Sequence, residues 1–171
     1  DDVEDGDKRI DNILANAQSR QLDFIVSLGD LCKPILANHK VLEKFNSLGV
    51  PFYPVIGNHE TDEFDLSAIT EFYSLKAPYY SVSHDSYKLI FMNTCCLTEN
   101  GTEKSYYKRN FKHSTSVYPI VPIDEIRWLS NELNDGKKCI IFSHHSFVNE
   151  FPKRGVSNKL VMQELFRENS V

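Results

Sequence analysis

The stretch FIVSLGDLCKP, residues 24–34, is a short apolar run that ends abruptly in Gly29-Asp30. The stretch FYPVIGNHE, residues 52–60, repeats this layout and ends in Gly-Asn-His-Glu. Short apolar runs bounded by turn residues are typical of buried strands, and a glycine allows the sharp turn and close backbone approach that such an ending needs. Each run therefore predicts a buried strand that places a polar, metal-ligating residue just past its carboxyl end.

A third apolar run, KKCIIFSHH (residues 137–145), also ends in polar residues, His144 and His145. Ligands of open α/β sheets bind beyond the carboxyl ends of the strands, so we expect the three endings to meet. The carboxylate of Asp30, the amide of Asn58 and an imidazole suit Mn, Fe or Zn better than they suit a thiolate site. Because adjacent strand residues point to opposite faces, only one of the two histidines can be a ligand.

The rest of the chain alternates between helical and strand patterns. Apolar residues recur at helical spacing in several segments, and a turn joins two further strands as a hairpin. The predicted helices cover residues 7–20, 35–49, 65–75, 122–136 and 157–169, and the hairpin covers residues 78–94. This order predicts an α/β domain in which helices cover a mixed sheet.

Residues 98–121 have no clean period and are predicted to form a long loop, a kind of segment that is often functional. The loop mixes basic with aromatic side chains, namely Lys104, Lys108, Arg109 and Lys112 with Tyr106, Tyr107 and Phe111. Such a segment could clamp a phosphate and stack on a base. The alternative is a solvated insertion whose aromatic residues cover the hairpin, and the sequence leaves both open.

Composition narrows the class of protein. The 171 residues carry a net charge of −5, which disfavours a protein that grips nucleic acid by neutralising phosphates. No stretch approaches the roughly eighteen apolar residues of a membrane span. The four cysteines are too few and too poorly spaced for a disulfide framework or a Cys-x-x-Cys zinc site. We therefore expect a cytoplasmic protein with reduced, buried cysteines and with neither a membrane nor a nucleic acid as partner; its oligomeric state stays open.

Three motifs, GD at 29–30, GNHE at 57–60 and SHH at 143–145, resemble in this order those of the calcineurin-like metallophosphoesterases. The helix EIRWLSNEL, ahead of the histidine strand, is similar to the Trp-Leu helix of that family. The resemblance spans essentially the whole chain. It implies an α/β fold of metallophosphoesterase type, a mixed β-sheet sandwich covered by helices.

The resemblance also implies a role for each motif residue. Asp30 would bridge two metal ions, and Asn58 and His144 would bind the second ion. His59 would donate a proton to the leaving oxygen, and Glu60 would hydrogen-bond and orient His59. The cofactors would be two divalent or trivalent ions of Mn, Fe or Zn.

Parts of the family pattern differ or fall outside the sequence. The family's His-x-Pro pattern selects His144, but Ser146 stands in place of the proline, so His145 remains an alternative. Lys33 stands where the pattern carries a second aspartate. Asp-x-His is expected upstream of these residues and Gly-His-x-His downstream. We thus expect residues 1–171 to be a single domain without its first and last strands, which alone binds metal weakly and hydrolyses little.

The implied function is metal-dependent phosphoester hydrolysis at a binuclear centre with a metal-bound hydroxide. We expect a small phosphorylated substrate, a phosphodiester or a nucleotide pyrophosphate, with Arg154 past the histidine strand as a phosphate-binding candidate. A phosphomonoesterase and a non-catalytic scaffold with an incomplete metal site are the alternatives. The intact Gly-Asn-His-Glu argues against the scaffold, because a scaffold has no use for His59.

Overall fold

The computed structural model describes residues 5–112, 115–148, 154–169 and 171. The helices are α1 (Gly6–Gln18), α2 (His39–Asn46), α3 (Leu66–Phe72), α4 (Ile123–Leu133) and α5 (Lys159–Glu168), with short 3-10 helices η1 (Leu36–Asn38), η2 (Glu60–Asp62) and η3 (Asn110–Lys112). The strands are β1 (Ile25–Ser27), β2 (Phe52–Pro54), β3 (Tyr80–His84), β4 (Tyr87–Phe91), β5 (Cys96–Glu99), β6 (Thr102–Ser105), β7 (Val117–Ile120) and β8 (Lys138–Phe142). Among these elements, no helix is long and apolar enough to cross a bilayer.

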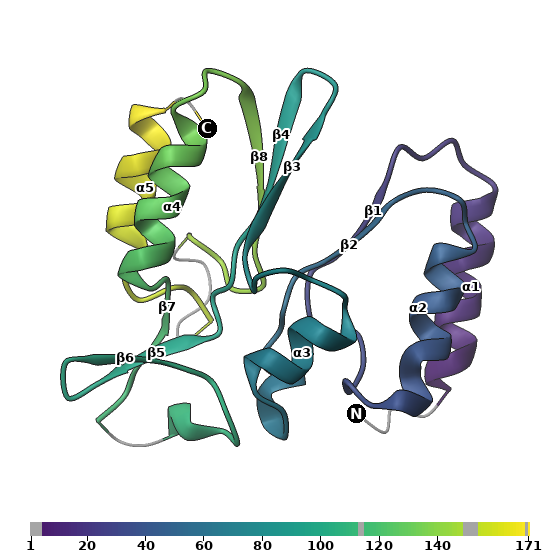
Figure 1. Cartoon of the computed structure of the whole chain (residues 1–171), viewed down its shortest axis with the longest axis horizontal. Helices are drawn as coiled ribbons and strands as arrows, with labels where there is room; N and C mark the ends of the chain where they lie inside the picture. Colours follow the sequence, from purple (N-terminus) through teal and green to yellow (C-terminus); the bar gives the residue numbers. More distant parts are fainter. Residues whose placement is uncertain (1–4, 113–114, 149–153, 170) are drawn as a thin grey trace.

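Two sheets lie at the centre of the molecule, with helices on both outer sides (Figure 1). Strands β1 and β2 are parallel, while β4 pairs with β3 antiparallel and with β8 parallel. Helices α1 and α2 cover the β1–β2 sheet, and α4 and α5 cover the other sheet. This arrangement is the mixed sandwich covered by helices that the resemblance predicts.

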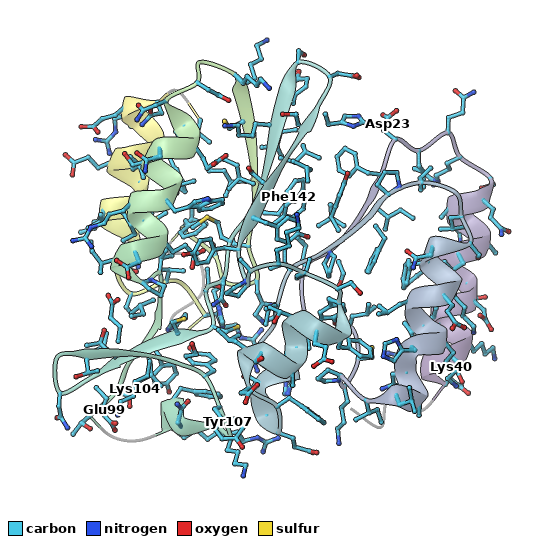
Figure 2. The ribbon with its side chains drawn as sticks, viewed as in Figure 1. Asp23, Lys40, Glu99, Lys104, Tyr107 and Phe142 are labelled. Atoms are coloured by element: carbon cyan, nitrogen blue, oxygen red, sulfur yellow. The ribbon has the colours of Figure 1, made fainter. Side chains whose placement is uncertain are left out.

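The core between the two sheets is largely aromatic. Phe91 of β4 stacks on Tyr80 at 4.6 Å and on Phe142 at 5.1 Å between ring centroids. Val55, which follows β2, packs in the same cluster, so the apolar residues of both sheets face one another. Phe142, labelled in Figure 2, lies at the middle of the molecule on the last residue of β8. This packing fixes the positions at which the strands end.

The segment 98–121, predicted as a loop, instead contributes to a third sheet of order β6-β5-β7. All four residues of β6 are exposed and polar, so this strand has no apolar face to recognise. In β7, Pro119 interrupts the sequence pattern of a strand. Glu99 and Lys104 form an ion pair of 2.8 Å across the β5–β6 hairpin (Figure 2). The prediction of a structureless loop was therefore wrong, because the pairing of these strands is carried by backbone hydrogen bonds that the side chains do not reveal.

Glu125, in the first turn of α4, is a fully buried carboxyl group. Its Oε1 accepts a hydrogen bond from the Asn93 N–H at 2.7 Å, while Oε2 has no partner among the described residues. Burial raises the pKa of Glu125 well above its ordinary value of 4.5, although the Asn93 N–H opposes this shift. The neutral acid is thus the form that the fold favours.

Replacing Glu125 with glutamine is expected to stabilise the protein at pH 8 but not at pH 4. When the pKa of a carboxyl group is higher in the folded than in the unfolded protein, the group contributes its full stabilisation below the unfolded-state pKa. This contribution to the free energy of unfolding is lost as pH rises through the folded-state pKa. Each unit of the raised pKa then costs about 1.4 kcal/mol at high pH, which the neutral amide avoids. Urea unfolding at pH 4, 6 and 8 measures this, with the exposed Glu43→Gln as control. A difference between wild type and Glu125→Gln that is the same at every pH would contradict the prediction.

Candidate active site

The two glycines of the opening motifs let three strand endings come together. A Cβ atom on Gly29 would lie 2.6 Å from Nδ1 of His144 and 2.7 Å from Cα of Gly57. A Cβ atom on Gly57 would overlap the carboxylate and the backbone nitrogen of Asp30. Gly29 and Asp30 also both have positive φ, of 98° and 58°. Left-handed backbone at a non-glycine residue is uncommon and often marks a functional site, so the turn that carries Asp30 is specifically constrained.

Glu60 provides that constraint through backbone hydrogen bonds. Its buried Oε2 accepts from the N–H groups of Asp30 at 3.0 Å and Gly57 at 3.1 Å. Its Oε1 accepts from Leu31 N–H at 2.9 Å and from the Tyr73 hydroxyl at 3.0 Å. Burial, followed by the nearby charge of Asp30, raises the pKa of Glu60, while the hydrogen bonds from the backbone oppose the shift. One carboxyl group therefore ties the turn after β1 to the turn after β2.

This geometry corrects the orienting role expected of Glu60. Its Oε2 accepts from both turns and its Oε1 from Leu31 and Tyr73. Nδ1 of the His59 ring lies instead 3.1 Å from Oδ2 of Asp62. His59 is nevertheless fixed beside Asp30, because its backbone N–H donates to Oδ1 of Asp30 at 2.9 Å. Sequence reasoning missed Asp62, although its place three residues after His59, on the first turn of a helix, was a usable signal.

Asp30, Asn58 and His144 converge at one point beyond the strands. Nε2 of His144 lies 3.0 Å from Oδ1 of Asn58 and 3.5 Å from Oδ2 of Asp30. Nδ1 of the same ring lies 2.8 Å from the carbonyl oxygen of Leu28, which can only accept. With Nδ1 donating to Leu28, the Nε2 lone pair, an amide oxygen and a carboxylate all face one another. Electron-pair donors gathered in this way, with the second ring nitrogen held by a carbonyl, fit a bound cation.

His145 occupies a different place from its neighbour. Its Nδ1 lies 2.8 Å from the Thr94 hydroxyl, and its N–H donates to the same oxygen at 3.1 Å. Burial, and then the charge of His144, lowers the pKa of His145 to about 4. Of the two candidates that the sequence leaves open, His144 is thus the one that faces Asn58 and Asp30.

A cavity of about 460 Å³ opens over these residues. Its lining combines the polar groups named above, Asp30, Asn58, His59, His144 and His145, with Tyr106, Phe111, Tyr118, Pro119 and Arg154. The three aromatic rings contact one another at centroid distances of 4.5–6.4 Å. Arg154 is held near the histidine strand because its carbonyl accepts from Ser146 N–H at 3.4 Å. Residues 149–153, which precede it, lie outside the described residues.

The basic residues of the segment 98–121 do not line this cavity in the described structure. Lys104 pairs with Glu99, Lys108 lies 5.0 Å from the Tyr107 ring centroid, and Arg109 pairs with Asp62 at 2.6 Å. The aromatic rings of the segment, by contrast, form one wall of the cavity. The segment therefore contributes aromatic residues to the cavity, and among the lining residues Arg154 carries the Lys- or Arg-type positive charge.

The described residues bring few ionisable metal-ligating side chains together. Within the part of the chain that the structure describes, no cluster of three or more His, Cys, Asp and Glu side chains is arranged to hold a metal ion. Asp30 and His144 are two side chains of these types, and the amide oxygen of Asn58 lies beside them as a third possible donor. An oxygen and nitrogen set of this kind suits Mn, Fe or Zn.

The chain was compared with known proteins. The family model described as calcineurin-like phosphoesterase matches residues 2–169. A structure search matches a dimetal phosphatase from Danio rerio, with 15% sequence identity and a TM-score of 0.70, over 94% of this chain and 67% of the other. A comparison with curated proteins gave no match. At that identity the structural match shows a shared fold, and the family model covers nearly every residue: the chain belongs to the calcineurin-like phosphoesterases.

Proposed function

We propose that this chain carries part of the catalytic centre of a metal-dependent hydrolase that cleaves a phosphodiester or a nucleotide pyrophosphate. Membership of the family supports metal-dependent phosphoester hydrolysis as the reaction class. The observation that carries the assignment is the convergence of Asp30, Asn58 and His144 beside His59, in the lining of one cavity. The family and the neighbouring dimetal phosphatase support two metal ions as cofactors.

The residues present have distinct tasks in this proposal. Asp30, Asn58 and His144 would hold metal, and bound metal would polarise the phosphoryl oxygens and lower the pKa of water. His59, fixed through its backbone to Asp30, would donate a proton from Nε2 to the departing oxygen. Arg154 lines the same cavity and would bind a phosphate oxygen or a second phosphate.

The cavity favours a substrate larger than a simple phosphomonoester. A volume of about 460 Å³ lies within the range of small-molecule sites and exceeds the needs of one phosphate group. Phe111 and Tyr118, which are partly exposed, offer aromatic faces for a planar group such as a nucleobase, whereas Tyr106, in contact with both rings, is buried. Arg154, a cation that lines the same cavity, suits a substrate that carries negative charge at two places.

Hydrolysis assays on the intact protein test this proposal. With Mn²⁺, we expect faster turnover of bis-p-nitrophenyl phosphate or ADP-ribose than of p-nitrophenyl phosphate, and loss of all three activities with EDTA. Preference for p-nitrophenyl phosphate would instead identify a phosphomonoesterase. Absence of metal-dependent hydrolysis on every substrate, with metal binding shown separately by calorimetry, would identify a non-catalytic scaffold.

A further inference from the structure

Arg109, in the turn between β6 and η3, forms an ion pair with Asp62, whose carboxyl group contacts His59. Nη2 of Arg109 lies 2.6 Å from Oδ2 of Asp62, the same oxygen that lies 3.1 Å from Nδ1 of His59. The Lys108 N–H donates to the carbonyl of Thr61 at 3.1 Å, next to Asp62 in the chain. The segment with Thr61 and Asp62 and the turn with Lys108 and Arg109 are therefore joined by one ion pair between side chains and one backbone hydrogen bond, although Asp62 and Arg109 are 47 residues apart.

The turn has a backbone shaped for this contact. Lys108 and Arg109 have positive φ angles of 49° and 58°, an unusual consecutive pair of non-glycine residues. Asn110 holds the turn from within, because its Oδ1 accepts from Tyr107 N–H and its Nδ2 donates to the Ser105 carbonyl. A strained backbone held by local hydrogen bonds indicates that the direction in which Arg109 points is fixed.

Burial separates this contact from an ordinary surface ion pair. Only 12% of the Asp62 side chain is exposed, against 52% of Arg109 and 46% of His59. The Arg109 guanidinium, and then the His59 ring, holds the pKa of Asp62 below its ordinary value. Asp62 therefore presents an ionised oxygen to Nδ1 of His59, which leaves Nε2 as the ring nitrogen on the opposite side.

We propose that Asp62, held by Arg109, is the positioning residue that orients His59 for proton donation to the leaving oxygen. The proposal rests on the proposed function of His59 and extends it to a segment outside the central sandwich. Asp62 touches no substrate; it fixes the tautomer and the direction of the imidazole. Arg109 alone of this turn would act on His59, through its contact with Asp62.

Leaving-group dependence tests this role, because a proton donor matters most when the departing oxygen is a strong base. In the intact protein with Mn²⁺, Asp62→Asn is expected to lower kcat/KM by about 10- to 100-fold on phenyl and alkyl phosphodiesters, and by less than about 3-fold on p-nitrophenyl phosphodiesters. Arg109→Ala should show the same pattern more weakly. Lys108→Ala is the matched control, since it removes a cation from the same turn without touching Asp62. An equal loss on all leaving groups, or none, would overturn the proposal.

A second measurement does not require activity. The ¹⁵N shifts of the His59 ring should report a proton on Nδ1 in the wild type, and a different tautomer mixture in Asp62→Asn. Unchanged shifts in the variant would overturn the positioning role even if hydrolysis is observed. A shift change in a protein that hydrolyses no phosphoester would refute the proposed function while leaving the contact between Asp62 and His59 established.

Discussion

Asp30→Asn is expected to lower kcat/KM of the intact protein by about 10³-fold or more, with a matching loss of metal affinity. The change keeps the size of the side chain and an oxygen to accept the His59 N–H, so the turn should persist. It removes the only negative charge among the three converging donors, since Asn58 and His144 are neutral ligands. Hydrolysis of bis-p-nitrophenyl phosphate and isothermal titration with Mn²⁺ measure the two effects.

Asp85→Asn provides the control for this experiment. Asp85 also has positive φ, of 51°, but its side chain is 90% exposed at the tip of the β3–β4 hairpin. The same chemical change at the same kind of backbone position should leave activity and metal affinity unchanged. Retention of more than about a tenth of wild-type activity in Asp30→Asn would contradict its place at the centre of the ligand set.

Gly57→Ala is expected to reduce kcat/KM by about 100-fold, because the added methyl group must displace Asp30. The methyl group meets the side chain and the backbone nitrogen of Asp30 together, so a simple rotation of Asp30 cannot relieve the overlap. The Glu60 hydrogen bonds to both turns would be strained at the same time. We expect an accompanying loss of about 1–3 kcal/mol in the free energy of unfolding, measured by urea titration.

Gly6→Ala is the matched control for the added methyl group. A Cβ atom at Gly6 would meet nothing within 4 Å. Gly6→Ala should therefore show wild-type kinetics and at least wild-type stability, since alanine favours a helix over glycine. Wild-type turnover in Gly57→Ala would show that the close approach of the two turns is dispensable for the chemistry.

The sequence predicted those parts of the fold in which apolar spacing is regular. The strands that include Val26 and Ile141, and the helix that includes Leu129, were expected close to where they lie. The sheet of β5, β6 and β7 was not, since β6 is TEKS and β7 carries a proline. Strands stabilised by backbone pairing at the surface leave no periodic pattern in their side chains.

The candidate site shows the same division. Residues that follow a glycine at a strand end were recognisable, and the structure brings Asp30, Asn58 and His144 together; their role as metal ligands stays a prediction. The partners of Glu60 and Asp62 were not recognisable, because they depend on which backbone N–H groups and loops lie nearby in space. Sequence motifs identify what a residue can do, whereas its neighbours decide which of these tasks it performs.

The anchoring of both turns by Glu60 bears on how the proposed metal site would exchange ions. Glu60 accepts hydrogen bonds from both turns and from Tyr73, so the conformational entropy of ordering these turns is lost during folding, ahead of any ion binding. A zinc finger, by comparison, is unfolded without its zinc ion. If Asp30, Asn58 and His144 hold metal as proposed, the order of their turns does not depend on the ion, so we expect one ion to replace another without unfolding; ligand type, geometry and metal availability would then decide which ion is bound.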